Sequence, residues 1–203
     1  VLNTRVFTQL MTLEASLIGK LGAGTATTNE AEIVSFVAAN AATAQSQRNV
    51  YDAGGNQIFS IDATGGYTRN WYDGQGRLTA QVRFATRMNL TGVNDSSTVA
   101  QLDALLTWPN ENETSYTVYD AAGRVRYTVQ LTSPSTAMVK DASYDGAGRL
   151  LQQRAFVTNM AFDQALAAKL VAGTATDADF VTFVATNAAT AQSQRSVYDA
   201  AGN

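Results

Sequence analysis

The sequence contains no cysteine and no histidine. Disulfides, thiolate chemistry, imidazole bases and the usual zinc sites are therefore excluded, and stability must come from packing and hydrogen bonds. Proline is scarce, with 2 in 203 residues. No apolar run reaches the roughly 18 residues of a membrane helix, and no basic-then-apolar leader is present, so we expect neither a membrane span nor a signal peptide in this window.

Charge is also sparse. Charged residues make up 15% of the chain and the net charge is −3, whereas nucleic-acid binding needs clustered Lys and Arg, so we expect no nucleic-acid partner. The hydrophobic content of 45% is that of a globular chain with a sizeable core. Of the 14 basic residues, eleven are arginines and three are lysines: Lys20, Lys140 and Lys169. Several arginines share one motif position, which suggests an architectural role for their planar donors.

What the sequence does have is internal duplication. The stretch NAATAQSQR occurs at 40–48 and again at 187–195, an offset of 187 − 40 = 147. Upstream, AGTAT at 23–27 recurs at 172–176 with an offset of 149, which implies a two-residue indel. Self-similarity at a fixed period is typical of stacked supersecondary units that bury their apolar faces against neighbours.

A shorter period is nested in the long one, because WYDGQGRL at 71–78 matches SYDGAGRL at 143–150, an offset of 72. We therefore predict a window of a longer array, divided into half-units. Residues 1–71 are the second half of one long repeat and contain two helices and hairpins. Residues 72–143 are the first half of the next repeat, and residues 144–203 are its second half, truncated within the hairpin motif.

The unit that recurs most often is Tyr-Asp-x-x-Gly-Arg, complete at 72–77, 119–124 and 144–149, closed by Asn at 51–56 and 198–203, and degenerate at 61–66. Asp accepts from the backbone two residues on, and Gly supplies the left-handed residue of a type I turn with a bulge, so each copy predicts a β-hairpin. The predicted structural residues are Tyr51, Asp52, Gly55, Tyr72, Asp73, Gly76, Arg77, Tyr119, Asp120, Gly123, Arg124, Tyr144, Asp145, Gly148, Arg149, Tyr198, Asp199 and Gly202.

The segments that flank the motif are β-branched and aromatic with a rough period of two, so they predict strands. In 124–129 the alternation puts Val125, Tyr127 and Val129 on one face and leaves Arg124 and Arg126 on the other. One face of the sheet is therefore predicted to be apolar and the other polar.

Between hairpins the apolar period becomes helical. The spacing of Thr27 and Glu30 resembles a capping box and predicts the start of a second helix, and a shorter helix is expected to end at Trp108 and Pro109. The predicted buried faces are Phe7, Leu10, Met11, Leu17, Ile18 and Leu21 in the first helix, Ile33, Val34, Phe36 and Val37 in the second, Phe180, Val181, Phe183 and Val184 in its duplicate, and Val99, Leu102, Leu105 and Leu106 in the shorter one.

The repeated YDxxGR motif, followed by Leu or Val, resembles the YD repeats of Rhs proteins, teneurins and the cocoon-forming subunits of bacterial Tc toxins. In that family the hairpins form a long spiralling sheet that encloses cargo or serves in adhesion. The resemblance implies that Tyr packs between successive turns and that Arg pairs with Asp or backbone carbonyls. The spacings 119 − 72 = 47 and 198 − 144 = 54 exceed the family's usual one by a helical insert, which suggests that helices shield one face. The self-cleaving core domain of many Rhs proteins has no counterpart here.

These observations predict a β-rich α+β repeat, in which antiparallel YD-type β-hairpins form a continuous spiralling sheet with short amphipathic helices inserted between hairpins. We expect a structural repeat module of a large secreted or cell-surface protein, bacterial and extracellular, that builds a filament, stalk or shell by stacking. Its expected partners are neighbouring repeats or identical subunits, with an enclosed polypeptide or a glycan as further candidates. No enzyme activity, metal or cofactor is predicted.

Three alternatives remain open. Aromatic side chains could bind sugars in a multivalent adhesin, and Trp71 and Trp108 are the best candidates because they lie outside the duplicated pattern. The turn aspartates could instead form a calcium ladder, or two carboxylates a glycosidase pair, although each turn holds one Asp and a duplicated unit would duplicate any active site. The triplets at 89–91, 94–96 and 112–114 fit the glycosylation pattern, which matters only in a eukaryotic source.

Overall fold

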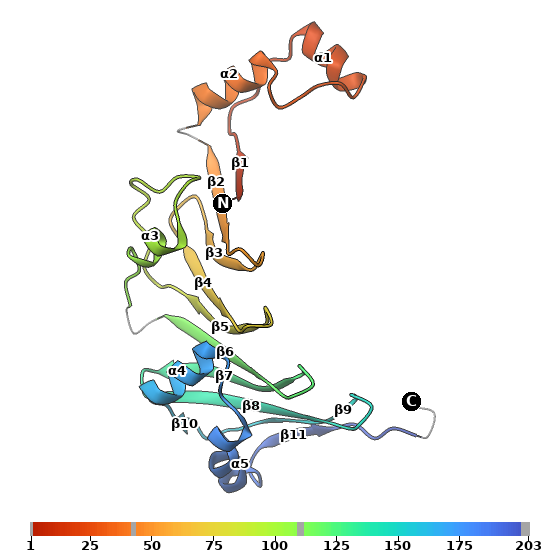
Figure 1. Ribbon diagram of the computed structural model, residues 1–203, viewed down its shortest axis with the longest axis vertical. Helices are drawn as coiled ribbons and strands as arrows, with labels where there is room; N and C mark the ends of the chain where they lie inside the picture. Colours follow the sequence, from red (N-terminus) through yellow and green to blue (C-terminus); the bar gives the residue numbers. More distant parts are fainter. Residues whose placement is uncertain (1, 42–43, 109–111, 200–203) are drawn as a thin grey trace.

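A computed structural model describes residues 2–41, 44–108 and 112–199. These residues form an antiparallel sheet of 11 strands that lie side by side in chain order, except that the short β10 pairs with β8. The strand direction rotates from β1 to β9 (Figure 1), as the twist of a β-sheet requires. The predicted β-rich α+β class is confirmed. The strands are β1 (Leu2–Val6), β2 (Gln45–Tyr51), β3 (Gln57–Ile61), β4 (Tyr67–Tyr72), β5 (Leu78–Arg83), β6 (Glu113–Tyr119), β7 (Val125–Ser133), β8 (Thr136–Tyr144), β9 (Leu150–Ala155), β10 (Met160–Ala161) and β11 (Gln192–Arg195).

The chain reverses direction alternately at the two opposite edges of the sheet that are formed by the ends of the strands. One edge, here called the turn edge, carries the tight YD turns, which project to the right in Figure 1. The opposite edge, the insert edge, carries three long segments: the first insert (7–44), the second insert (84–112) and the third insert (156–191). The turns at the turn edge are 52–56, 73–77, 120–124 and 145–149.

Each insert joins two strands that are neighbours in the sheet: β1 to β2, β5 to β6, and β9 to β11. The sheet therefore continues without a break past every helical segment. Among the described residues, no helix has the length and apolarity needed to cross a membrane. The helices are α1 (Ala15–Gly22) and α2 (Ala31–Asn40) in the first insert, α3 (Val99–Asp103) in the second, and α4 (Gln164–Ala172), the 3-10 helix η1 (Asp177–Asp179) and α5 (Val181–Asn187) in the third.

One face of the sheet, here called the covered face, carries the core. In β7 Tyr127 and Val129 are buried and Thr128 between them is exposed, so the alternation predicted for this strand is confirmed. Arg126 departs from the prediction that it stays on the opposite face. Its side chain is long enough to reach round the strand to the third insert, where its Nε lies 2.9 Å from a carboxylate oxygen of Asp177.

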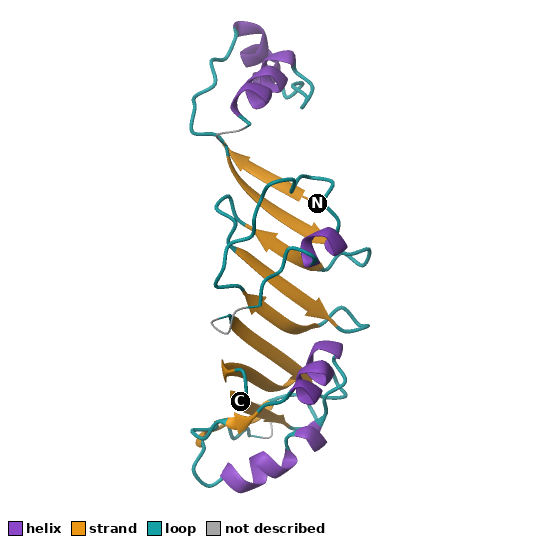
Figure 2. Cartoon of the chain, turned by 90° about the vertical axis from the view of Figure 1, so that its left-hand side faces the viewer, coloured by secondary structure: helices purple, strands orange, loops and turns teal. Residues whose placement is uncertain are grey.

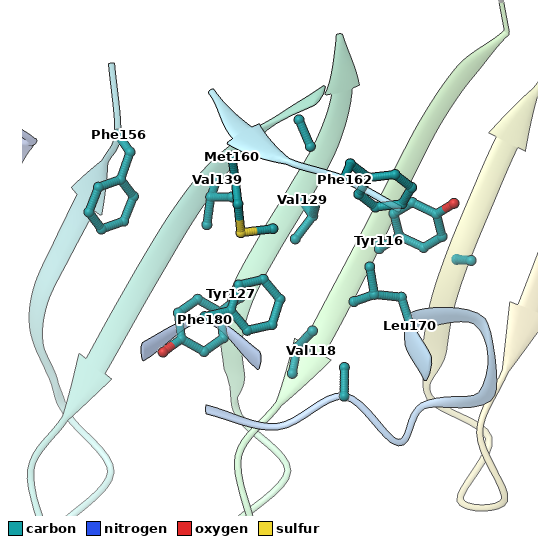
Figure 3. Close-up of a cluster of buried hydrophobic side chains, with 13 residues drawn as sticks. Tyr116, Val118, Tyr127, Val129, Val139, Phe156, Met160, Phe162, Leu170 and Phe180 are labelled. Carbon is teal, nitrogen blue, oxygen red and sulfur yellow. The ribbon is translucent and has the colours of Figure 1, made fainter. Parts of the chain in front are cut away.

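The second and third inserts fold back over strands that precede them in the chain. In the second insert, Leu102 of α3 is buried in one cluster with Phe59 of β3. In the third, Leu170 of α4 and Phe180 are buried in another cluster that includes Tyr127 of β7 (Figure 3). Each of these two inserts therefore completes the core of the strands before it.

The helix predicted from the stripe of Phe7, Leu10 and Met11 is wrong over its first half, because α1 begins only at Ala15 and Leu10 is 97% exposed. The same spacing recurs in the third insert at Phe156 and Met160, which are buried although they lie outside any helix. The apolar spacing marks an extended segment that docks on the sheet, and a period of four residues does not separate this from a helix.

The prediction that Ile33, Val34, Phe36 and Val37 are buried is wrong in part, since α2 has no fully buried residue: Val34 is exposed and the other three are half-buried. The helix lies beyond the end of the sheet, at the top of Figure 2, and no strand covers it. Its predicted capping box is displaced: α2 begins at Ala31, and the carboxylate of Glu30 accepts from the Thr27 backbone N–H at 3.4 Å in the preceding turn.

In the duplicate of α2 only part of the predicted face is buried. Phe180 is fully buried, Phe183 and Val184 are half-buried, and Val181 is exposed, because this short helix meets the sheet at its first turn. The shorter helix α3 buries Leu102 and ends at Asp103, ahead of the predicted end at Trp108. Leu105 is exposed because it follows the helix, and Pro109 lies outside the described residues.

The half-unit boundaries predicted at 71/72 and 143/144 fall inside β4 and β8. Both strands pair with neighbours on each side. The boundaries therefore describe sequence periodicity within one sheet.

The turn at 62–66 gives the first prediction. A Cβ built on Gly65, whose φ is +84°, would lie 2.5 Å from the Met88 carbonyl oxygen of the second insert. We expect Gly65→Ala to lower the free energy of unfolding by roughly 2–4 kcal/mol, because the left-handed backbone strains an alanine and its Cβ would push the second insert away from the turn. Gly74→Ala is the control, because its Cβ would meet nothing within 4 Å. Urea unfolding measures both, and an equal effect in the two variants would contradict the prediction.

Candidate assembly site along the turn edge

The YD turns share one backbone geometry, seen clearly at 73–77. The Asp73 N–H donates to the Arg77 carbonyl at 3.0 Å, and the Gly76 N–H donates to the Asp73 carbonyl at 3.0 Å. Gly76 has a φ of +75°, the left-handed conformation that closes this turn with a bulge in the β4–β5 pairing. The same pair of hydrogen bonds occurs at 52–56, 120–124 and 145–149.

The aspartate of each turn organises the loop. Oδ1 of Asp73 accepts from the backbone N–H groups of Gln75 at 2.9 Å and Arg77 at 3.0 Å, and Oδ2 accepts from the Arg77 Nε at 2.7 Å. Asp120 and Asp145 repeat all three contacts with their own arginines. Charge-assisted bonds of this kind hold both the loop and the arginine side chain in place.

These contacts favour the ionised aspartates. The backbone N–H and the guanidinium of Arg149 lower the pKa of Asp145 below its ordinary value. At Asp73 burial acts to raise the pKa, but the hydrogen bonds from Arg77 outweigh it and the pKa is lowered. The turn carboxylates are therefore charged at neutral pH and act as hydrogen-bond acceptors within the turn.

Neighbouring turns are connected by the tyrosines. The Tyr119 hydroxyl donates to the carbonyl of Leu78, the residue after the preceding turn, at 2.9 Å. The Arg77 guanidinium of that preceding turn lies over the Tyr119 ring, 4.5 Å from its centroid. We call this pair of contacts the latch. It recurs as Tyr144 with the Val125 carbonyl at 2.9 Å and Arg124 at 4.6 Å, and as Tyr198 with the Leu150 carbonyl at 3.0 Å and Arg149 at 4.6 Å.

The latch lies where main-chain pairing between hairpins has stopped. The pairing of β5 with β6 runs from Arg83 to Ala80 and does not reach Leu78 at the turn edge. The hydroxyl of Tyr119 thus supplies a hydrogen bond at a position where the two backbones have separated. Burial raises the pKa of this tyrosine, so the hydroxyl keeps its proton and acts as the donor.

The turn at 52–56 has half of the latch. Asn56 replaces arginine, and its side chain donates to Asp52 at 2.9 Å. Tyr72 still donates to the carbonyl of Gln57 at 3.0 Å, and among the described residues no cation lies over its ring. Tyr51, in the strand before this turn, is 38% exposed.

The degenerate copy at 61–66 does not belong to this series. It turns at the insert edge, where Asp62 accepts from the backbone of Gly66 at 2.9 Å and the Arg87 side chain donates to the carbonyl of Thr64 at 3.0 Å. The turn of this sixth copy therefore forms a surface against which the second insert packs. Of the last motif copy, Tyr198 takes part in a latch, Asp199 is exposed, and Gly202 lies outside the described residues.

A buried ion pair within the sheet was not predicted from the sequence. Asp141 of β8 is 4% exposed and accepts from the Arg154 Nε at 2.9 Å, and the Arg126 Nη1 lies 3.5 Å from the same carboxylate. A second pair joins Arg69 of β4 to Asp103 of α3 at 2.9 Å. The available signal was a charged residue at an inward position of an apolar strand, which favours a buried pair.

Within the described ranges, no group of three or more acidic side chains has the geometry to hold a metal ion. The turn aspartates lie one to a turn, and each is engaged by its own loop. The arrangement along this edge connects successive hairpins by repeated, nearly identical contacts.

No protein-family model and no curated protein matches this chain.

The latch gives the second prediction. Tyr119→Phe keeps the ring beneath Arg77 and removes only the hydroxyl that bonds to Leu78, so we expect a loss of about 1 kcal/mol in the free energy of unfolding. Tyr67→Phe is the matched control, because the buried Tyr67 hydroxyl has no hydrogen-bond partner. We expect that variant to be neutral or slightly more stable in the same denaturant titration. A Tyr119→Phe protein as stable as the parent would show that the hydrogen bond of the latch contributes nothing.

Proposed function

We propose that this chain is a structural repeat module of a large secreted or cell-surface protein of the YD/Rhs type, and that it builds a filament, stalk or shell by stacking of repeats. The observation that carries the proposal is the latch, in which Tyr119, Tyr144 and Tyr198 each bond to the hairpin before them. Such a contact has a use only where hairpins follow one another in a series.

Three features of the described residues support this reading. The sheet runs in chain order, so each unit contacts mainly its neighbours, as in a quasi-one-dimensional array. The turn carboxylates are used within their own loops, which leaves the turn edge with an architectural role. The sheet also twists along its length, and continuation of that twist over many units would give a spiral.

The proposed location is the exterior of a bacterial cell. A low charge content and an abundance of uncharged polar residues suit an exported surface protein, and the chain has no cysteine that depends on a reducing compartment. Neighbouring repeats or identical subunits are the proposed partners, and an enclosed polypeptide is a further candidate.

The third prediction tests stacking directly. A tandem chain in which residues 1–149 precede Val1 keeps the period of the repeat, and we expect one longer sheet in place of two separate bodies. Small-angle scattering and negative-stain images should show a single elongated particle whose length grows with each added copy. Two compact particles joined by a linker, or a tandem chain with unfolded added strands, would rule out stacking.

A second function, carbohydrate binding by a repeat array, is favoured by one cleft. It has a volume of about 450 Å³ and lies between the second and third inserts, where Trp71, Trp108 and Tyr116 meet Asn112 and Gln130. Trp108 is 60% exposed and its ring centroid lies 6.3 Å from that of Trp71. An exposed indole beside amide side chains is a surface on which sugars stack.

The fourth prediction separates the two functions. If the cleft binds glycans, the chain will bind members of a glycan array and its tryptophan fluorescence will change on titration with the same sugar. Trp108→Ala should then abolish binding, whereas Leu10→Ala, at a fully exposed site far along the chain, should leave it unchanged. The absence of any bound glycan would leave the structural function as the sole proposal.

A further inference from the structure

The first and third inserts are two copies of one segment, in sequence and in local structure. Lys20 and Lys169 correspond at 169 − 20 = 149, and each forms the same ion pair, Lys20 with Glu30 and Lys169 with Asp179. Two side-chain hydrogen bonds also recur: Thr25 to the Lys20 carbonyl and Thr174 to the Lys169 carbonyl, both 3.4 Å, and Asn40 to the Phe36 carbonyl and Asn187 to the Phe183 carbonyl, 2.9 and 2.8 Å.

The two copies differ in what covers them. Leu170 of α4 is 1% exposed, whereas its counterpart Leu21 of α1 is 49% exposed. Phe162 is 8% exposed, and its counterpart Leu13 is 46% exposed. Leu17 of α1 is 1% exposed, so the first insert buries part of its apolar side by itself, but the part that carries Leu13 and Leu21 is open.

The surface that covers the third insert is the covered face of β4 to β8. Phe180 stacks on Tyr127 of β7 with ring centroids 4.2 Å apart. The Thr79 hydroxyl of β5 donates to the Val171 carbonyl at the end of α4, at 2.8 Å. Figure 3 shows Phe180 and Leu170 on this side of the sheet.

Gly173 and its counterpart Gly24 show the same difference in what covers the two inserts. A Cβ on Gly173 would lie 2.8 Å from the Cβ of Asp73 and 3.0 Å from the Cγ2 of Thr79, so the third insert touches the YD turn at 73–77. The counterpart Gly24 has nearly the same φ, +67° against +69°, and a Cβ there would meet nothing within 4 Å. The first insert keeps the shape needed to approach such a turn closely.

The strands next to the two inserts show the same difference between a covered copy and an open one. By the same offset β1 corresponds to β9, since Leu2 matches Leu151. Strand β9 lies between β8 and β11, whereas β1 pairs with β2 on one side and its other edge is open in the described part of the chain. An equivalent of β8 would pair with that open edge.

We propose that the exposed apolar side of the first insert, together with the open edge of β1, is the docking surface for a second copy of the strand set β4 to β8, joined in register ahead of β1. This inference rests on the proposed function, because it assumes that repeats stack. One ion pair of the third insert would have no equivalent in this docking, since Thr28 stands where Asp177 pairs with Arg126 in the third insert, 177 − 28 = 149. Each insert would thus seal the repeat before it.

The test compares the 203-residue chain with an extended chain in which residues 67–149 are repeated directly before Val1. Amide hydrogen exchange is followed in peptides from 15–22 and 31–40. We expect exchange in these helices to slow by about tenfold or more in the extended chain, toward the rates of α4 and α5, because a packed helix opens less often.

The controls are two substitutions in the first insert. In the extended chain Leu21→Ser should return α1 to fast exchange, whereas Leu10→Ser should have no effect, because Leu10 is 97% exposed and its counterpart Asn159 is exposed as well. In the unextended chain neither substitution should change exchange elsewhere, which shows that both variants fold.

The outcomes separate the two proposals. If the added strands are protected but α1 and α2 exchange as fast as before, the docking inference is wrong and stacking stands. If the added strands are themselves unprotected, stacking fails and the docking inference fails with it. Protection that Leu21→Ser does not remove would also overturn the docking surface.

Discussion

The hydrogen bond from a turn tyrosine to the carbonyl after the preceding turn holds the hairpins of this protein together at the turn edge. Tyr119 and Tyr144 make it at the same distance, 2.9 Å, and in both cases the arginine of the earlier turn covers the ring. The aspartate that folds the turn also positions that arginine. A single motif therefore makes its own hairpin and half of the contact to the next one.

The inserts provide the second constraint, because they supply the core that a single sheet lacks. The strands of one sheet cannot bury a face by themselves, and the second and third inserts fold back over the covered face and bury it. The core of one unit is thus completed by a segment that follows it in the chain. This dependence on a neighbour, together with the latch, is what supports the proposal that repeats stack.

The turns and the presence of helical inserts were predictable from sequence, and the packing of the inserts was not. A YD turn is set by contacts within five residues, such as Asp73 with Arg77, so its local sequence carries the information. The apolar stripe from Phe7 to Met11 depends on a distant surface, since its counterpart Phe156 lies against the covered face. Pattern reasoning interpreted that stripe as a helix because it considers only the spacing along the chain. It also placed 61–66 with the other turns, although that turn lies at the opposite edge.

The amino-acid sequence by itself determined where the chain reverses, which residues bond within each turn and that the units repeat, because these depend on contacts between residues close in the chain. Only the tertiary structure decided which tyrosine meets which carbonyl, that Asp141 is buried beside Arg154, and which strands an insert covers. Those outcomes depend on strand order and on how far neighbouring backbones separate at the turn edge. The copies of one insert show this difference most clearly, since Leu21 and Leu170 occupy equivalent positions and are 49% and 1% exposed.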